Sequence, residues 1–185
     1  MNATDDDRDL AEALWRGETC LANDSIQFGD GTIAILSSDM PLSSRATSLK
    51  VLRQSTWLAV LVEGLGNPLH SSLLTWVSRL REIRTKFAGH QLRIESGECS
   101  GNGSFGYVAV EKERDSSSSE LRWVAFFSGS NPFDELSIQD GVLHALSTSG
   151  YRYSFQLSDP TNVSIQQRED LTWWGKDEKN GIEDK

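Results

Sequence analysis

The chain has 185 residues, a formal net charge of −9 and a hydrophobic fraction of 37%. Its length suits one domain with a full core, and its composition is ordinary for a globular protein, which argues against wholesale disorder. The acidic balance makes nucleic acid and anionic lipid surfaces unfavourable partners. The first residues lack a hydrophobic run and no later run is long enough to span a bilayer, so we expect a cytoplasmic protein.

The predicted elements begin with a short helix near the N-terminus. Asp5 and its acidic neighbours up to Asp9 precede an apolar segment, which favours a helix with an acidic first turn that ends at Gly17. Next, Asp30-Gly31 separates two short runs of β-forming residues, and glycine accepts the positive φ of a tight turn. We therefore predict a hairpin between residues 25–28 and residues 32–36.

The middle of the chain indicates a strand followed by a long helix. Residues 56–64 form a nearly unbroken apolar run that is short for a helix, so we expect a strand covered on both faces. Asn67 and Pro68 are suited to open a helix that ends at Ala88 before Gly89. Its apolar residues recur at intervals of three and four: Leu69, Leu73, Trp76, Val77, Leu80, Ile83 and Phe87.

A strand over residues 90–96 follows this predicted helix. Strand, helix and strand would then form one right-handed crossover between two parallel strands. In this interpretation Arg79 and Lys86 lie on the solvated face of the helix, while Trp57 and Trp76 belong to the core.

From Gly106 onward, short β-like runs alternate with turns rich in Gly, Ser and Asp. They predict an antiparallel meander with strands at residues 107–112, 121–127, 136–139, 142–147, 151–157 and 163–166. The predicted fold class is therefore α+β: a mixed sheet with one strand-helix-strand crossover, a long C-terminal meander and one main amphipathic helix. We expect a single domain over residues 1–174 and a flexible tail over residues 175–185, which has too little apolar surface to offset the entropy of ordering.

Residues 101–108 match G-x-G-x-x-G-x-V and so resemble the glycine-rich loop of protein kinases. The sequence contains neither His-Arg-Asp nor Asp-Phe-Gly, and Lys112 follows in the same predicted strand instead of on a later one. A dinucleotide site needs a helix after the loop, and a Walker loop ends in Gly-Lys followed by Ser or Thr. We therefore interpret the loop from Gly101 to Gly106 as a connection between two strands.

The sequence predicts neither a metal site nor a cofactor. The three histidines are scattered and none has a second ligand at the spacing of known metal motifs. A nuclease arrangement is disfavoured because the adjacent Glu111 and Lys112 face opposite sides of a strand. One alternative is kept, an enzyme or small-ligand-binding domain with a site formed by His90, Glu95 and Cys99 beside the glycine loop.

Two aromatic segments suggest a partner-binding surface. Trp173 and Trp174 stand between charged residues, where the competing interpretation is that one indole closes the core. Phe133 is followed directly by Asp134 and Glu135 in a predicted exposed turn. We predict a non-catalytic acidic interaction module, of the inhibitor or immunity type in a bacterial cytoplasm, that neutralises a basic protein partner.

Overall fold

The computed structural model describes residues 2–37, 46–65, 73–100, 103, 105–115 and 118–167. These residues contain two helices, α1 (Asp5–Arg16) and α2 (Trp57–Leu65), and thirteen strands. The strands are β1 (Thr19–Leu21), β2 (Ser25–Phe28), β3 (Thr32–Leu36), β4 (Ala46–Ser48), β5 (Val51–Thr56), β6 (Leu74–Phe87), β7 (His90–Cys99), β8 (Gly106–Glu113), β9 (Ser119–Phe127), β10 (Phe133–Gln139), β11 (Val142–Ser147), β12 (Tyr151–Gln156) and β13 (Val163–Gln167).

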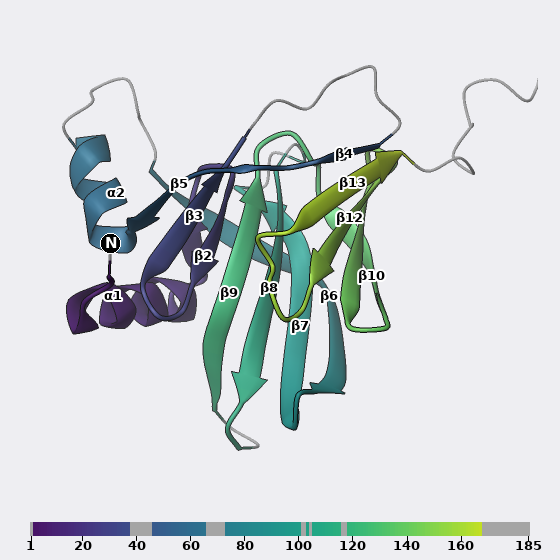
Figure 1. Cartoon of the computed structure of the whole chain (residues 1–185), viewed down its shortest axis with the longest axis horizontal. Helices are drawn as coiled ribbons and strands as arrows, with labels where there is room; N and C mark the ends of the chain where they lie inside the picture. The colour runs from purple at the N-terminus through teal and green to yellow at the C-terminus, as the bar shows by residue number, and fades with distance from the viewer. Residues whose placement is uncertain are drawn as a thin grey trace, which may run out of the picture.

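The strands form two antiparallel sheets (Figure 1). The eight-stranded sheet has the order β1-β6-β7-β8-β9-β2-β3-β5, and the five-stranded sheet has the order β10-β11-β12-β13-β4. The fold is therefore largely β. The prediction of an α+β fold with one main helix on a mixed sheet is wrong.

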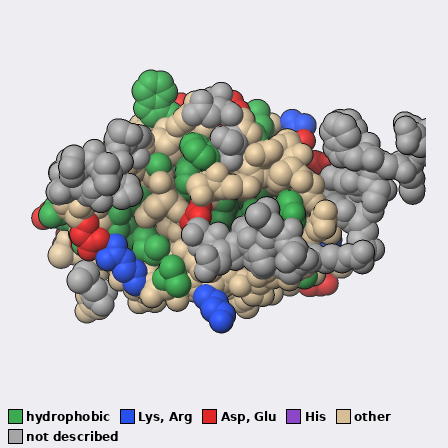
Figure 2. Space-filling model, turned by 90° about the horizontal axis from the view of Figure 1, so that it is seen from above, with side chains coloured by type: hydrophobic (Ala, Val, Ile, Leu, Met, Phe, Trp, Pro, Cys, Tyr) green, Lys and Arg blue, Asp and Glu red, His purple; other side chains and the backbone are tan. Residues whose placement is uncertain are grey.

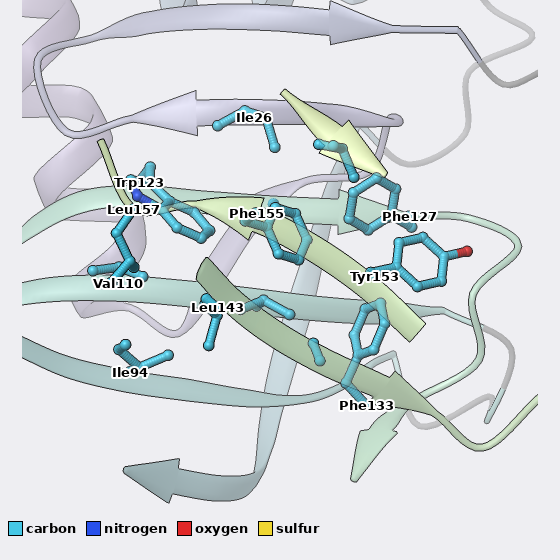
Figure 3. Packing of buried hydrophobic residues seen from close by; sticks show 14 of the residues in the cluster. Ile26, Ile94, Val110, Trp123, Phe127, Phe133, Leu143, Tyr153, Phe155 and Leu157 are labelled. Carbon is cyan, nitrogen blue, oxygen red and sulfur yellow. The ribbon is translucent and has the colours of Figure 1, made fainter. Parts of the chain in front are cut away.

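The two sheets pack face to face around one aromatic core (Figure 3). The ring of Trp123 on β9 lies 5.5 Å from that of Phe155 on β12, and the ring of Phe127 lies 4.9 Å from that of Tyr153. Alternate residues of central strands such as β7, β8, β9 and β12 point into this core, and the residues between them point to the outer faces. The architecture is thus a β-sandwich.

The helices lie against the outer face of the eight-stranded sheet, on the left of Figure 1, and the five-stranded sheet lies on the right. Asp7 stabilises both helices. It forms a capping box with Thr4 at the start of α1, and its Oδ1 accepts the backbone N–H of Leu58, 3.0 Å away, at the start of α2. Burial raises the pKa of Asp7, but these hydrogen bonds outweigh burial and hold the pKa below its ordinary value.

Several elements were predicted correctly. The N-terminal helix has the expected acidic first turn, and β2 pairs with β3 as the predicted hairpin. The C-terminal strands are antiparallel, although the meander is divided between two sheets, with β8 and β9 in one and β10 to β13 in the other.

The apolar run at residues 56–64 forms α2, so the predicted central strand is wrong. Periodicity alone does not separate a buried strand from a short apolar helix. Here the helix is favoured because its first N–H groups find acceptors in Asp7 and Thr56.

The predicted helix over residues 68–88 is also wrong, since its C-terminal two thirds form β6. Ala88 and Gly89 have φ values of 48° and 78°, which is the backbone of a two-residue hairpin turn, and β6 pairs antiparallel with β7. The parallel crossover therefore does not exist. Residues 66–72 lie outside the described part of the chain.

A β-bulge interrupts the pairing of β6 with β7. Arg79 pairs with Gly97 and Arg81 pairs with Ser96, so Leu80 is an extra residue on β6. A Cβ atom on Gly97 would lie 1.9 Å from the backbone oxygen of Ser78. The bulge thus requires glycine at this position of β7.

Neither helix in the described residues is long and apolar enough to cross a membrane. The single domain over residues 1–174 and the tail over residues 175–185 stay predictions, because residues 168–185 are not described.

Replacing Asp7 by Asn should lower the free energy of unfolding by about 2 kcal/mol at neutral pH, because the acceptors at both helix starts are weakened. A carboxyl with a lowered pKa stabilises the fold above its unfolded pKa, and this stability is lost as pH falls through the folded pKa. The difference should therefore disappear in strong acid when urea unfolding is followed against pH. Asp9→Asn, an exposed change on α1, is the control and should have little effect at any pH.

Replacing Gly97 by Ala should lower the free energy of unfolding by at least about 2 kcal/mol, since the added carbon collides with backbone. Gly129→Ala is the matched control, because a Cβ there meets nothing within 4 Å. Equal urea midpoints for the two variants would contradict the role given to the bulge.

Candidate functional site

A cleft of about 320 Å³ opens on the outer face of the eight-stranded sheet, beside the C-terminal half of α1. Most of its lining side chains are charged. The lining residues are Glu12, Trp15, Arg16, Glu18, Val77, Arg79, Arg93, Glu95, Tyr107, Glu111 and Ser119. Such a concentration of charge at a partly buried surface makes this cleft the first candidate for a site.

Strand alternation brings the cleft residues to one face of the sheet. Arg93 and Glu95 are two apart on β7, while Tyr107 and Glu111 are four apart on β8. Arg93 stands directly opposite Glu111 in the register of these strands. The inner face carries Ile94 and other core residues, so the outer face receives the polar members of the same strands.

Glu111 is held on both of its oxygens. The indole N–H of Trp15 donates to Oε1, while the Arg93 guanidinium and the Ser119 hydroxyl donate to Oε2. The Nε of Arg93 lies 2.9 Å from Oε2. This carboxylate therefore ties α1 to β7 and β9 and has a structural role.

Glu95 is also buried, but its hydrogen-bond and ionic partners lie farther away than those of Glu111. It is only 8% exposed; the Tyr107 hydroxyl donates to Oε1 over 3.2 Å, and a guanidinium nitrogen of Arg79 lies 3.6 Å from Oε2. Burial and the nearby charge of Glu111 raise the pKa of Glu95 in spite of these partners. Burial and Glu95 likewise raise the pKa of Tyr107 well above its ordinary value, so the phenol remains a hydrogen-bond donor.

The bulge decides where Arg79 points. In a regular strand, Arg79 and Glu82 would face opposite sides because they are three residues apart. The extra residue Leu80 places both on the cleft side, where a nitrogen of Arg79 lies 2.7 Å from Oε2 of Glu82. Arg79 is thereby held at the edge of the cleft, near Glu95.

Glu18 and Trp76 extend the site beyond the cleft. Glu18 follows α1 with a φ of 54°, a left-handed conformation that is unfavourable for most residues with a Cβ atom. It lines both the cleft and a shallower neighbouring pocket of about 280 Å³, which also contains Trp76. Trp76 is 78% exposed, so the expectation that it belongs to the core is wrong.

The structure does not bring His90, Glu95 and Cys99 together. His90 is exposed at the first position of β7 and Cys99 is buried at its last, which separates them by about 30 Å along the strand. Cys99 contacts Cys20, and this hydrogen bond together with burial raises the pKa of the Cys20 thiol well above its ordinary value. Of the three residues, only Glu95 lines the cleft.

The loop from Gly101 to Gly106 joins β7 to β8, which confirms that it connects two strands. Its residues Gly101, Asn102 and Ser104 lie outside the described part of the chain. Gly106 approaches the connection between β9 and β10, because a Cβ there would lie 2.2 Å from the backbone oxygen of Asn131. None of the described residues of this loop, Gly103, Phe105 and Gly106, lines the cleft.

The predicted partner-binding residues differ in their burial, and two of them lie outside the described part of the chain. Phe133 is completely buried between Phe127 and Tyr153, so its expected exposure is wrong. Asp134 is half-buried and Glu135 is exposed on β10. The predicted anchors Trp173 and Trp174 lie outside the described residues.

The cleft residues that the sequence analysis missed come from three parts of the chain: the end of α1 and the residues after it, the stretch predicted as a helix, and the neighbouring strands β7, β8 and β9. The available signal was the alternation in residues 83–87 followed by the Ala88-Gly89 pair and a second alternating run, which is typical of a hairpin. Recognition of that hairpin would have placed Glu82 and Glu95 opposite each other, as they are in the structure.

In the part of the chain that the structure describes, no group of three His, Cys, Asp or Glu residues is arranged to hold a metal ion. The cleft has four carboxylates, but its three arginines lie among them, and Glu111 is fully engaged. The arrangement is thus suited to binding charged groups.

Glu95→Gln should raise the free energy of unfolding at neutral pH, because a carboxyl with a raised pKa destabilises the fold where it is ionised. Below about pH 4 both the folded and the unfolded carboxyl are protonated, so the difference between variant and parent should vanish there. The measurement is urea unfolding across this pH range. A variant less stable than the parent at neutral pH would contradict the assigned environment of Glu95.

Comparison of the chain with protein-family models, curated proteins and solved structures found no match. The function therefore has to be inferred from the chemistry of the cleft and of the surface around Trp76.

Proposed function

We propose that the protein is a non-catalytic binding module that recognises a basic protein partner through the recognition surface, defined as Glu18, Trp76, Arg79 and Glu95. One observation carries the proposal: a tryptophan that is 78% exposed stands next to a cleft holding a buried carboxylate with a raised pKa. An exposed tryptophan is a typical anchor of protein interfaces. A carboxylate that is short of positive charge is stabilised when a partner supplies a cation.

The net charge of −9 supports a basic partner, since it steers cations toward the protein and repels anions. This charge is not collected in one patch on the face seen in Figure 2, where acidic and basic side chains are interspersed. A diffuse field accelerates encounter but does not select a partner. Selection therefore needs a local site, and the recognition surface supplies one.

The lining of the cleft favours binding over catalysis. A nucleophile or general base needs a free lone pair beside the substrate, but both oxygens of Glu111 already accept hydrogen bonds. Tyr107 is completely buried behind Glu95. Glu95 is thus the one cleft carboxylate buried in the sheet that remains open to a ligand, which suits recognition better than acid–base chemistry.

An inhibitor or immunity-type protein in a bacterial cytoplasm is the setting that we favour. Cys20 and Cys99 are buried in contact with each other, and a reducing compartment would keep such a pair as free thiols. A rigid sandwich that presents one aromatic anchor and one acidic cleft is suited to covering the basic active site of an enzyme.

The direct test is capture of the partner from the cells that make the protein, followed by calorimetry with the purified partner. Trp76→Ala should weaken binding about 30-fold, the effect of losing an interface anchor, and should leave the unfolding free energy nearly unchanged. Val62→Ala on α2 is the matched control, because Val62 is 67% exposed on a different element. An acidic partner, or full affinity in Trp76→Ala, would refute the proposal.

Added salt should weaken the same complex, since charge attraction between surfaces is screened within about 10 Å at 0.1 M ionic strength. The measurement is the association rate at increasing salt. A rate that does not depend on salt would contradict charge steering by the acidic surface.

Glu18→Gly should separate stability from binding. Glycine relieves the left-handed backbone at this position, so the unfolding free energy should rise by up to about 1 kcal/mol, while partner affinity falls because a carboxylate is lost. Ala88→Gly provides the control, since Ala88 has a φ of 48° in the hairpin turn at the far end of β6. That variant should gain stability without losing affinity.

A further inference from the structure

The geometry points to an arginine side chain of the partner as the occupant of the cleft, with its guanidinium on the carboxylate of Glu95. This inference rests on the proposed function and names the chemical group of the partner that the recognition surface binds. Four features of the cleft support it: the pairing of its charges, its size, the backbone of Glu18 and the rigidity of its walls.

Each arginine of the cleft has a carboxylate partner other than Glu95. Arg93 pairs with Glu111, Arg16 lies 3.6 Å from Glu12, and Arg79 lies 2.7 Å from Glu82. Arg79 approaches Glu95 only to 3.6 Å, which is longer than the roughly 2.8 Å of a charge-assisted hydrogen bond. Oε2 of Glu95 therefore has a guanidinium nearby but none at hydrogen-bond distance, and it offers an acceptor to an incoming donor.

Glu18 is the second carboxylate of the cleft without a dedicated cation. Among the described residues no arginine or lysine forms an ion pair with it, and it stands at the junction of the cleft and the Trp76 pocket. Its φ of 54° would suit glycine or asparagine better, so a carboxylate is kept there at a cost in stability. Strained backbone of this kind is concentrated at binding sites.

The size of the cleft suits a single side chain. Its volume of about 320 Å³ is at the lower end for ligand pockets, which suits a guanidinium with its methylene stem better than a cofactor. Arginine fits better than lysine, because its planar group donates two parallel hydrogen bonds to a carboxylate and is more easily stripped of water. An anionic group would meet the negative field of the whole protein.

The walls of the cleft are preorganised. Glu95 lies in the middle of β7, which is paired with β6 on one side and with β8 on the other. The Tyr107 hydroxyl donates a hydrogen bond to its Oε1. The bulge opposite Gly97 fixes Arg79 at the edge, where Glu82 holds it. An arriving guanidinium therefore meets an acceptor already in position and displaces only the long contact to Arg79.

The inference is tested with the full chain labelled with ¹⁵N and with N-acetylarginine methylamide as the probe. The indole N–H of Trp15 lines the cleft through its bond to Glu111 and reports occupancy in the NMR spectrum. We expect a saturable shift of this signal with a dissociation constant in the range of about 1 mM, as befits one small side chain. N-acetylcitrulline methylamide, which has nearly the same shape without the charge, should cause no saturable shift.

Two variants sharpen the test. Glu95→Gln removes the charge with little change of shape and should weaken the probe at least tenfold. Arg79→Ala removes the internal cation nearest Glu95 and should strengthen the probe several-fold, which a merely structural role of Glu95 would not produce. The signals of the remaining residues show whether each variant stays folded.

Equal binding of the arginine and citrulline probes, or unchanged affinity in Glu95→Gln, would overturn the inference. If the partner still requires Trp76 while the arginine probe leaves the Trp15 signal unmoved, the arginine assignment fails and the proposed function stands. If the partner proves independent of Trp76 and the probe does not bind, both fail.

Discussion

The aromatic contact between the two sheets is the interaction on which the other parts of the structure depend. Phe127 on β9 packs against both Tyr153 and Phe155 on β12, and Trp123 extends the same layer. Once these rings define the inner face of the eight-stranded sheet, the pleat sends the residues between them to the outer face. The charges of β7 and β8 consequently gather there, where α1 covers part of them.

Two carboxylates with the same surroundings acquire different roles through their partners. Glu111 receives an indole, a guanidinium and a hydroxyl, so its charge is compensated inside the fold. Glu95 is diagonally across on the next strand but obtains one phenol and one distant guanidinium. Glu111 therefore joins α1 to the sheet. Glu95 has no cation at hydrogen-bond distance, so an external cation would stabilise its charge.

In the proposed recognition surface, the features that would serve binding lower the stability of the fold. Glu18 occupies a left-handed position and burial raises the pKa of Glu95, and each lowers the stability of the free protein. An exposed Trp76 adds apolar surface that water solvates poorly. Natural proteins retain such features where function uses them, because a partner recovers the free energy that folding alone does not.

Local signals in the sequence were sufficient for the turns and for the capped helix. Asp30-Gly31 determined a hairpin because the turn conformation involves only four consecutive residues. The acidic run from Asp5 likewise determined the start of α1 through interactions within the first turn. The alternation after Gly106 determined strands for the same reason. None of these required knowledge of a distant residue.

Tertiary structure decided the assignments of residues 57–65 and 74–87. The apolar residues in both segments fit the period of a helix as well as that of a strand. The structure adopted depends on partners outside each segment: Asp7 accepts a hydrogen bond at the start of α2, and β7 pairs with β6. The candidate site depended on these assignments, because Arg79, Glu82 and Glu95 meet only when β6 is a bulged strand opposite Gly97. The sequence by itself therefore determined the acidic charge and the local turns, while packing between distant segments decided which side chains share a surface.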